Sequence, residues 1–205
     1  MAFSDFKNVE QVIEKYPLIL KKEKFLPDVH LELPAWFLDN LNFALRRQAA
    51  QESEIFFRES IIYPFLQQAW KRHQKLKLWL NVPLFYSNEL SGEPDYLISL
   101  WPEGVISKLV NQPLLAVMEA KKQDFEGGWA QCLAAMIACQ KINASAPLTI
   151  YGIVTTGLTW RFGKLENNVF TEDLFAYSID TPARVFGLLD FVFARSEEQL
   201  LPEFA

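Results

Sequence analysis

The sequence is poor in the residue types that mark several common kinds of site. It contains two cysteines and two histidines in 205 residues, and no Cys/His pattern for a zinc site is present. Cys132 and Cys139 lie in a segment that predicts a helix, and about two turns, or roughly 10 Å, separate them. This separation is too long for a disulfide, and we expect two reduced thiols in the core.

Several motifs of nucleotide binding and acyl transfer are also absent. The chain has no Gly-x-x-x-x-Gly-Lys loop, no Gly-x-Gly-x-x-Gly turn after a strand, and no Ser/His/Asp arrangement. Neither His30 nor His73 lies in a recognisable catalytic context. No apolar run reaches the roughly 18 residues that span a bilayer, and the first residues lack a signal-peptide pattern. We therefore expect a cytoplasmic protein without membrane contact.

An excess of positive charge is missing as well. The formal net charge is -5, so no global positive field attracts nucleic acid. Binding to nucleic acid would need a local patch, for which Lys71–Lys77 is a candidate, although such runs more often form a solvated surface. Apolar residues, in contrast, make up half of the chain and aromatic residues 14%. This composition excludes disorder and predicts a thick core or a partner surface.

Length and composition predict a single domain over 1–205. We divide it into a helical extension over 1–50, a core over 51–157, and a C-terminal hairpin and helix over 158–205. The patterns of the core follow the order α-β-β-β-α-β, so the expected fold class is mixed α/β.

The expected elements of the core differ in how strongly the sequence marks them. Its first helix is the clearest amphipathic segment, although Pro64 predicts a kink or a second start within it. Three strands in sequence predict a meander, and the apolar helix after them predicts packing on the sheet. The elements are a helix over 51–73, strands over 76–85, 95–100 and 114–121, a helix over 129–141 and a strand over 148–154.

Weaker patterns flank this core. The extension predicts helices over 8–16 and from Pro34, with a polar connector at 21–24 and an extended stretch after Pro27. The chain between 101 and 113 has the composition of a loop. Beyond the core we expect a hairpin strand over 159–165, an edge strand over 169–179 and a helix over 182–201.

The most unusual stretch is Leu114–Lys122, where a short apolar run ends in charged residues instead of turn residues. Alternate side chains of a strand share a face, so Glu119 and Lys121 stand side by side at the end of an apolar row. Burial of an unpaired charge costs several kcal/mol or shifts its pKa. Such charges must therefore reach water, pair with each other or hold a metal ion.

A second acid lies at the start of the preceding strand. Antiparallel neighbours bring these two strand ends together, so Asp95 and Glu119 are expected to converge on one divalent ion. The Ala120 carbonyl and waters would complete the octahedral oxygen shell of Mg²⁺, for which Mn²⁺ is a substitute. Lys121 would reach the attacking water or the phosphate. The pattern predicts metal-assisted hydrolysis of a phosphodiester.

Pro94–Asp95 followed by Glu119-Ala120-Lys121, in this order of elements, resembles the PD-(D/E)XK nuclease superfamily, which has the restriction-endonuclease-like fold. The resemblance covers roughly Gln51 to Gly157 and looks closest to small, uncharacterised bacterial members. It rests on four sets of positions, Gly92–Tyr96, Glu119–Lys122, Gly127–Gly128 and Gln131.

The resemblance implies roles for individual residues. Asp95 and Glu119 would be the metal ligands, and Lys121 would act on the nucleophile or the transition state. Many members also place a glutamate on the first core helix, facing the metal. The resemblance favours Glu54 for this position, whereas helical periodicity favours Glu59, and both are retained as candidates.

A glutamine on the second core helix completes the candidate site. Gln131 resembles a glutamine that some branches of the superfamily place near the metal. The tyrosine that accompanies it in one of these branches is absent here, since Ala135 stands four residues later.

These residues predict a magnesium-dependent DNA endonuclease of a restriction or repair type. The acidic total charge opposes DNA binding, so contact with DNA would depend on local lysines and arginines. A homodimer would suit an enzyme that cuts two strands, although no residue demonstrates one. The alternative is a catalytically inactive nuclease-fold module that binds a partner through aromatic residues, namely Trp36, Phe37, Trp70, Trp79, Trp101, Phe191 and Phe193.

Overall fold

The computed structural model of the chain describes residues 2–49, 52–101, 110, 112–144 and 148–200. Its described part is mixed α/β, with an eight-stranded sheet in the order β1-β9-β8-β7-β6-β5-β2 and with β10 paired to β8. Strand pairs β1·β9 and β6·β7 are parallel, and the other pairs of this sheet are antiparallel. The strands are β1 (Ile19–Lys22), β2 (Leu76–Leu80), β5 (Tyr96–Leu100), β6 (Leu114–Ala120), β7 (Ile150–Thr155), β8 (Thr159–Glu166), β9 (Val169–Glu172) and β10 (Tyr177–Ser178).

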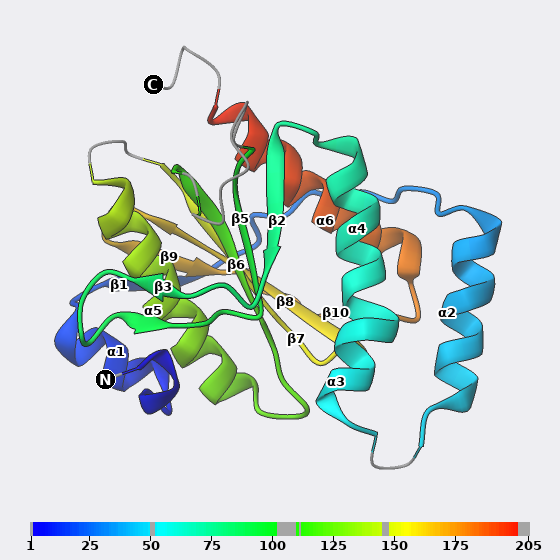
Figure 1. Cartoon of the computed structure of the whole chain (residues 1–205), viewed down its shortest axis with the longest axis horizontal. Coiled ribbons are helices and arrows are strands. Elements are labelled where there is room, and N and C mark those ends of the chain that lie inside the picture. Colours follow the sequence, from blue (N-terminus) through cyan, green and yellow to red (C-terminus); the bar gives the residue numbers. More distant parts are fainter. Residues whose placement is uncertain (1, 50–51, 102–109, 111, 145–147, 201–205) are drawn as a thin grey trace.

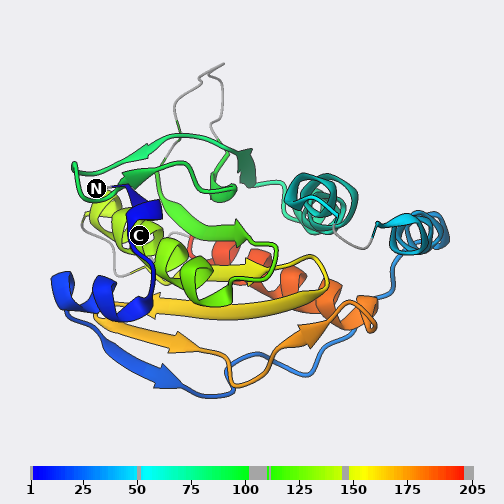
Figure 2. The same cartoon turned by 90° about the horizontal axis from the view of Figure 1, so that it is seen from below.

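Helices cover both faces of this sheet (Figures 1 and 2). On one face lie α5 and α1, together with the short hairpin formed by β3 and β4; on the other lie α4 and α6, with α2 outermost. The bounds are α1 (Val9–Lys15), α2 (Ala35–Arg47), α3 (Glu54–Phe57), α4 (Tyr63–Arg72), α5 (Phe125–Asn143), α6 (Pro182–Glu198), β3 (Leu84–Phe85) and β4 (Ser91–Gly92).

The buried strands and α5 explain the high apolar content of the chain. Every residue of β6 is buried, and α5 buries residues all round its circumference, including the reduced thiols of Cys132 and Cys139. Asn143 closes this helix onto the sheet, since its side chain accepts from Leu114 N at 2.8 Å and donates to Leu114 O at 2.7 Å. The sequence-based predictions of a meander, β2-β5-β6, and of a buried helix packed on it are confirmed.

The first core helix contains a π-helical segment, Arg58–Ile62, between α3 and α4. The Tyr63 N–H donates to the Arg58 carbonyl, five residues back, which makes this turn wider than an α-helical one. Pro64 follows directly and has no N–H to donate, and its ring would crowd the carbonyl four residues back in a regular helix. The expected effect of Pro64 is therefore present as a local widening, and the helix continues as α4.

This wider turn corrects the prediction from helical periodicity. At a constant 100° per residue, Ile55 would lie on the same apolar stripe as Ile62 and Leu66, and Glu59 would lie close to the centre of that stripe. In the structure Ile55 is 67% exposed and Glu59 is also exposed. The angle per residue changes across the π-helical segment. The buried face of α4 therefore does not predict which residues before the segment are buried.

Two other predicted elements also differ. The strand expected over 76–85 ends at Leu80, because Asn81 adopts a left-handed conformation (φ 46°) and the chain turns before β3. The expected polar connector at 21–24 is partly strand β1, which covers β9, so β9 is not the edge strand. Every residue of β1 is exposed, and the apolar alternation that marks a strand is absent. Residue 51 and most of the loop expected over 101–113 lie outside the described residues.

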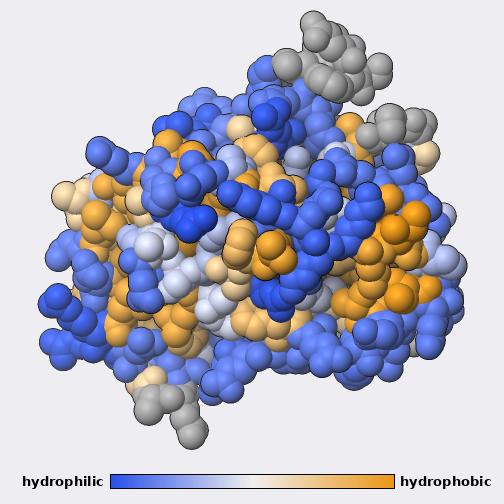
Figure 3. Space-filling view, turned by 180° about the vertical axis from the view of Figure 1, so that it is seen from behind, coloured by the Kyte–Doolittle hydropathy of each residue, from blue (hydrophilic) through white to orange (hydrophobic). Residues whose placement is uncertain are grey.

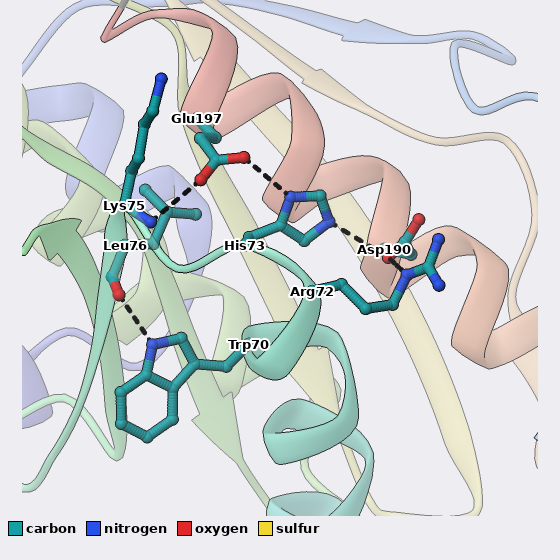
Figure 4. Close-up of polar contacts among 7 residues, drawn as sticks. All are labelled: Trp70, Arg72, His73, Lys75, Leu76, Asp190 and Glu197. Atoms are coloured by element: carbon teal, nitrogen blue, oxygen red, sulfur yellow. Dashed lines mark hydrogen bonds and ion pairs between the residues drawn. The ribbon is translucent and has the colours of Figure 1, made fainter. Parts of the chain in front are cut away.

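The turn from α4 to β2 is joined to α6 by a polar network around His73 (Figure 4). His73 Nε2 lies 3.1 Å from Asp190 Oδ1 and its Nδ1 lies 3.2 Å from Glu197 Oε2. Arg72 Nε donates to the same Asp190 oxygen at 2.6 Å, and the Lys75 N–H donates to Glu197 at 3.0 Å. The turn is thus held in one conformation from both ends.

This network predicts a pH-dependent contribution to stability. Burial lowers the pKa of His73, but the hydrogen bonds and charges of Asp190 and Glu197 outweigh burial and raise the pKa above its ordinary value. A raised folded pKa means that the stabilisation is complete below about pH 6.5 and is lost as the pH rises through the folded value.

We expect His73→Gln to lose about 1–2 kcal/mol of unfolding free energy near pH 5.5 and less near pH 9. Urea unfolding of variant and wild type at several pH values measures this difference. His30→Gln, at an exposed position, is the control. A deficit of His73→Gln that does not change with pH would contradict the assignment of a charged His73.

Candidate active site

The register of β5 and β6 brings Asp95 and Glu119 to one end of the sheet. Tyr96 pairs with Met118 across these antiparallel strands, so Asp95, just before β5, lies beside the end of β6. The Ala120 N–H donates to Asp95 Oδ2 at 2.8 Å. Both acids are buried, with 8% of Asp95 and 4% of Glu119 exposed. The two strand ends therefore meet as the sequence predicts.

Glu119 and Lys121 lie on the same face of the chain, as the alternation of a strand requires. The distance between Lys121 Nζ and Glu119 Oε2 is 3.4 Å. Burial, together with the negative charges of Asp95 and Glu54, raises the pKa of Glu119 to about 8 against the opposing effect of Lys121. In the metal-free protein Glu119 therefore holds its proton at neutral pH, and a bound cation would have to displace that proton.

Arg58 is part of the site and was not predicted from the sequence. Its Nη1 lies 2.9 Å from Asp95 Oδ1, and its Nη2 donates to Asn81 Oδ1 at 2.5 Å. The guanidinium carbon lies 5.7 Å from the centroid of the Tyr96 ring, and the Tyr96 hydroxyl donates to the Arg58 carbonyl at 3.2 Å. Arg58 is therefore fixed against the acid at the start of β5.

The guanidinium of Arg58 remains positively charged. Burial lowers the pKa of its guanidinium, but Asp95, Tyr96 and Glu54 together raise the pKa above its ordinary value. Helical periodicity gives no signal for this residue, because Arg58 begins the π-helical segment.

The structure separates the two glutamate candidates of the first core helix. Glu54 is partly buried, and its charge acts on both Glu119 and Arg58. Glu59 is exposed and acts on Tyr96. Of the two, Glu54 is the one directed to the site.

Gln131 lies on α5 and is partly buried. Among the described residues its side chain forms no hydrogen bond that joins it to Asp95, Glu119 or Lys121. Gln131 lies about one turn after Gly128 along α5, and Gly128 packs against Lys121. Gln131 is therefore near the cluster but not linked to it.

Close packing brings α5 and α3 to this end of the sheet. A Cβ at Gly128 would lie 2.7 Å from Val154 Cγ1 and 3.0 Å from Lys121 Cγ, so only glycine allows α5 to approach Lys121. On the other side, Phe57 packs on Gly157, which turns from β7 into β8 at a φ of 81°. These contacts position the helix that carries Glu54 and Arg58.

A hollow of about 350 Å³ opens at the same end of the sheet. Polar groups of several elements line it, but Asp95, Glu119 and Lys121 are not among its lining residues. Its lining includes Glu52, Phe57, Lys122, Gln123, Phe125 and Thr156.

The carboxylates of Asp95 and Glu119 fit a divalent cation such as Mg²⁺ if the ion pair between Asp95 and Arg58 loosens. Carboxylate oxygens are the ligands that Mg²⁺ and Mn²⁺ prefer, and Mg²⁺ is usually held by one or two carboxylates, with waters and phosphate oxygens as further ligands. Within the described ranges no group of three Asp, Glu, His or Cys side chains forms a ready-made cluster, so Asp95 and Glu119 would supply the protein carboxylates. Because Asp95 Oδ1 pairs with Arg58, this pair must loosen for Asp95 to bind a metal.

No protein-family model and no curated protein matches this chain. In the part of the chain that the structure describes, no helix has the length and apolar character needed to cross a membrane.

Proposed function

We propose that the protein is a magnesium-dependent nuclease that hydrolyses phosphodiester bonds in DNA, with a restriction-endonuclease-like core of the PD-(D/E)XK type. The proposal rests on one observation above all, the convergence of Asp95, Glu119 and Lys121 at adjacent strand ends. The order of helix, three meander strands, helix and parallel strand supports it. Mn²⁺ is the expected substitute for Mg²⁺.

Each residue of the cluster has a role in this proposal. Asp95 and Glu119 hold the cation, which when bound polarises the phosphate and lowers the pKa of a bound water. Lys121, 3.4 Å from Glu119, orients the attacking water and offsets negative charge as it develops on the phosphate. Glu54 adds negative charge to the cluster from the first core helix.

The experiment compares metal binding with cleavage in matched variants. Lys121→Ala is expected to keep Mn²⁺ binding in isothermal titration and to lose about 10²–10³-fold in the cleavage rate of supercoiled and linear DNA. Lys21→Ala is the control, since this exposed lysine lies on β1 at the edge of the sheet, away from Asp95 and Glu119. Unchanged cleavage in Lys121→Ala would remove this lysine from the mechanism.

Asp95→Asn tests the metal site itself. Asparagine keeps an oxygen that can accept from the Ala120 N–H, whereas alanine would leave that N–H and Arg58 without their partner. We expect Asp95→Asn to fold and to lose Mn²⁺ binding and cleavage together. Binding at wild-type strength would contradict the assignment of Asp95 as a ligand.

A second candidate function is a catalytically inactive nuclease-fold module that binds or assembles with a partner. The Arg58–Asp95 pair favours this alternative, because it places a permanent positive charge beside the acid that would hold the metal. The same titration separates the two functions: a wild-type protein that binds neither Mg²⁺ nor Mn²⁺ is the module and not the enzyme.

A further inference from the structure

A second hollow lies at the opposite end of the sheet from the candidate active site. Its volume is about 420 Å³. Asp95 precedes β5 and Trp101 follows it, so six residues of extended chain, or roughly 20 Å, separate the two sites. The lining consists of Gln67, Trp70, Lys71, Gln74, Leu76 and Trp101, and we call it the tryptophan pocket.

A hydrogen bond holds the Trp70 ring of this pocket, and a lysine lies close to both indole rings. Trp70 Nε1 donates to the Leu76 carbonyl at 2.7 Å, as Figure 4 shows. Lys77 Nζ lies 4.7 Å from the ring centroid of Trp70 and 5.5 Å from that of Trp101. Trp101 is nevertheless 44% exposed, so an aromatic face is held ready beside a positive charge.

The charges around the pocket are mostly positive. Lys71 and Lys75 are exposed and Lys77 is partly exposed, all within one short segment. Among the described residues, Asp190 and Glu197 on α6 lie beside the same turn and are bound to Arg72, His73 and the Lys75 N–H (Figure 4). The His73 network also fixes the turn that carries these lysines. The pocket is thus a rigid, basic and aromatic surface on an acidic protein.

This combination selects for a ligand with flat aromatic groups and regular negative charge. Bases of a single strand stack on exposed aromatic rings, while lysines next to the rings contact the phosphates. The amides of Gln67 and Gln74 line the same hollow and offer donors and acceptors to base edges. A duplex keeps its bases stacked on each other, and so cannot use the indole face.

We infer that the tryptophan pocket binds single-stranded DNA, with a base stacked on Trp101 and the backbone beside Lys71 and Lys75. The inference rests on the proposed function for the choice of DNA as the polymer, and it names the substrate class as DNA with a single-stranded segment. It explains a basic run within a chain of net charge -5, because that run serves one local site.

The test uses fluorescence anisotropy of a labelled oligothymidylate and of a blunt duplex of equal length, in EDTA so that no cleavage occurs. The full-length wild-type protein is expected to bind the single strand more tightly than the duplex. Trp101→Ala is expected to weaken binding of the single strand by about 5- to 100-fold, and Trp101→Phe to restore most of it, since a base stacks on either ring. Lys71→Ala is expected to reduce the slope of log affinity against log salt by about 0.7.

Matched controls lie elsewhere on the surface. Phe85→Ala removes an exposed aromatic side chain from β3, and Lys21→Ala removes an exposed lysine from β1 at the other edge of the sheet. Both are expected to bind the single strand like the wild type. Circular dichroism of Trp101→Ala verifies that the variant is folded.

Three results would overturn the inference: equal or tighter binding of the duplex, no binding of oligothymidylate, or equal single-strand affinity in Trp101→Ala and wild type. The failure of the nuclease proposal is a separate result. Trp101-dependent binding without metal-dependent cleavage would support the pocket and contradict the enzyme. Metal-dependent cleavage together with equal single-strand affinity in Trp101→Ala and wild type would contradict the pocket and support the enzyme.

Discussion

In metal-free buffer at pH 9, Glu119→Gln is expected to be more stable than the wild-type protein, by about 2 kcal/mol or more. Burial first, and then Asp95 and Glu54, raise the pKa of Glu119 to about 8 from an ordinary value of 4.5. Between these values the folded state binds the proton more tightly than the unfolded state, so wild-type stability falls as the pH rises. Glutamine removes the charge that causes this loss.

The same substitution is expected to abolish Mg²⁺-dependent cleavage, by about a thousandfold or more, because a metal ligand is lost. Chemical unfolding in EDTA at pH 5, 7 and 9 measures the first effect, and a DNA cleavage assay measures the second. Glu59→Gln is the matched control, since Glu59 lies on the neighbouring helix and is exposed. If the difference in unfolding free energy between Glu119→Gln and wild type did not change with pH, the raised pKa of Glu119 would be contradicted.

Arg58→Ala is expected to show opposite effects with and without metal. Removal of one partner from a buried ion pair costs about 3–5 kcal/mol, so the variant melts at a lower temperature than the wild type in EDTA. Loss of the guanidinium also frees Asp95 Oδ1, and we expect Mn²⁺ affinity to rise about tenfold or more. Saturating Mn²⁺ should therefore restore most of the lost stability.

Thermal unfolding with and without Mn²⁺, together with isothermal titration, checks this prediction. Arg58→Lys keeps the charge but not the forked contact to Asp95 and Asn81, and it provides a folded variant if Arg58→Ala is unstable. Arg47→Ala, at an exposed position on α2, is the control. Weaker Mn²⁺ binding in Arg58→Ala would show that Arg58 assists the cation instead of competing with it.

The parts of the site that lie on the sheet could be predicted from the sequence. Strand alternation, which depends on neighbouring residues alone, places Glu119 and Lys121 on one face. Antiparallel pairing of two strands that follow each other in the sequence brings Asp95 to them. Arg58 could not be predicted in the same way. Its contact with Asp95 depends on how a helix packs against the sheet, over 36 residues of intervening sequence.

Other differences have a local physical cause. Helical periodicity pointed to Glu59, whereas the resemblance pointed to Glu54, because periodicity assumes a constant angle per residue through a helix that contains a π-helical turn. Strand β1 was missed because all of its residues are exposed, so it leaves no apolar pattern. The break at Asn81 depends on a left-handed residue that asparagine tolerates but does not require.

Pro64 and the wider turn before it also restrict how this protein can change by mutation. Loss of one codon within 59–62 would leave an α-helical turn, and Glu54 and Arg58 would rotate by about 100° around the helix axis relative to α4. The ring of Pro64 would then press on the carbonyl four residues back. Such a deletion is thus tolerated only together with replacement of the proline, so the length of this helix is fixed for as long as Pro64 is present.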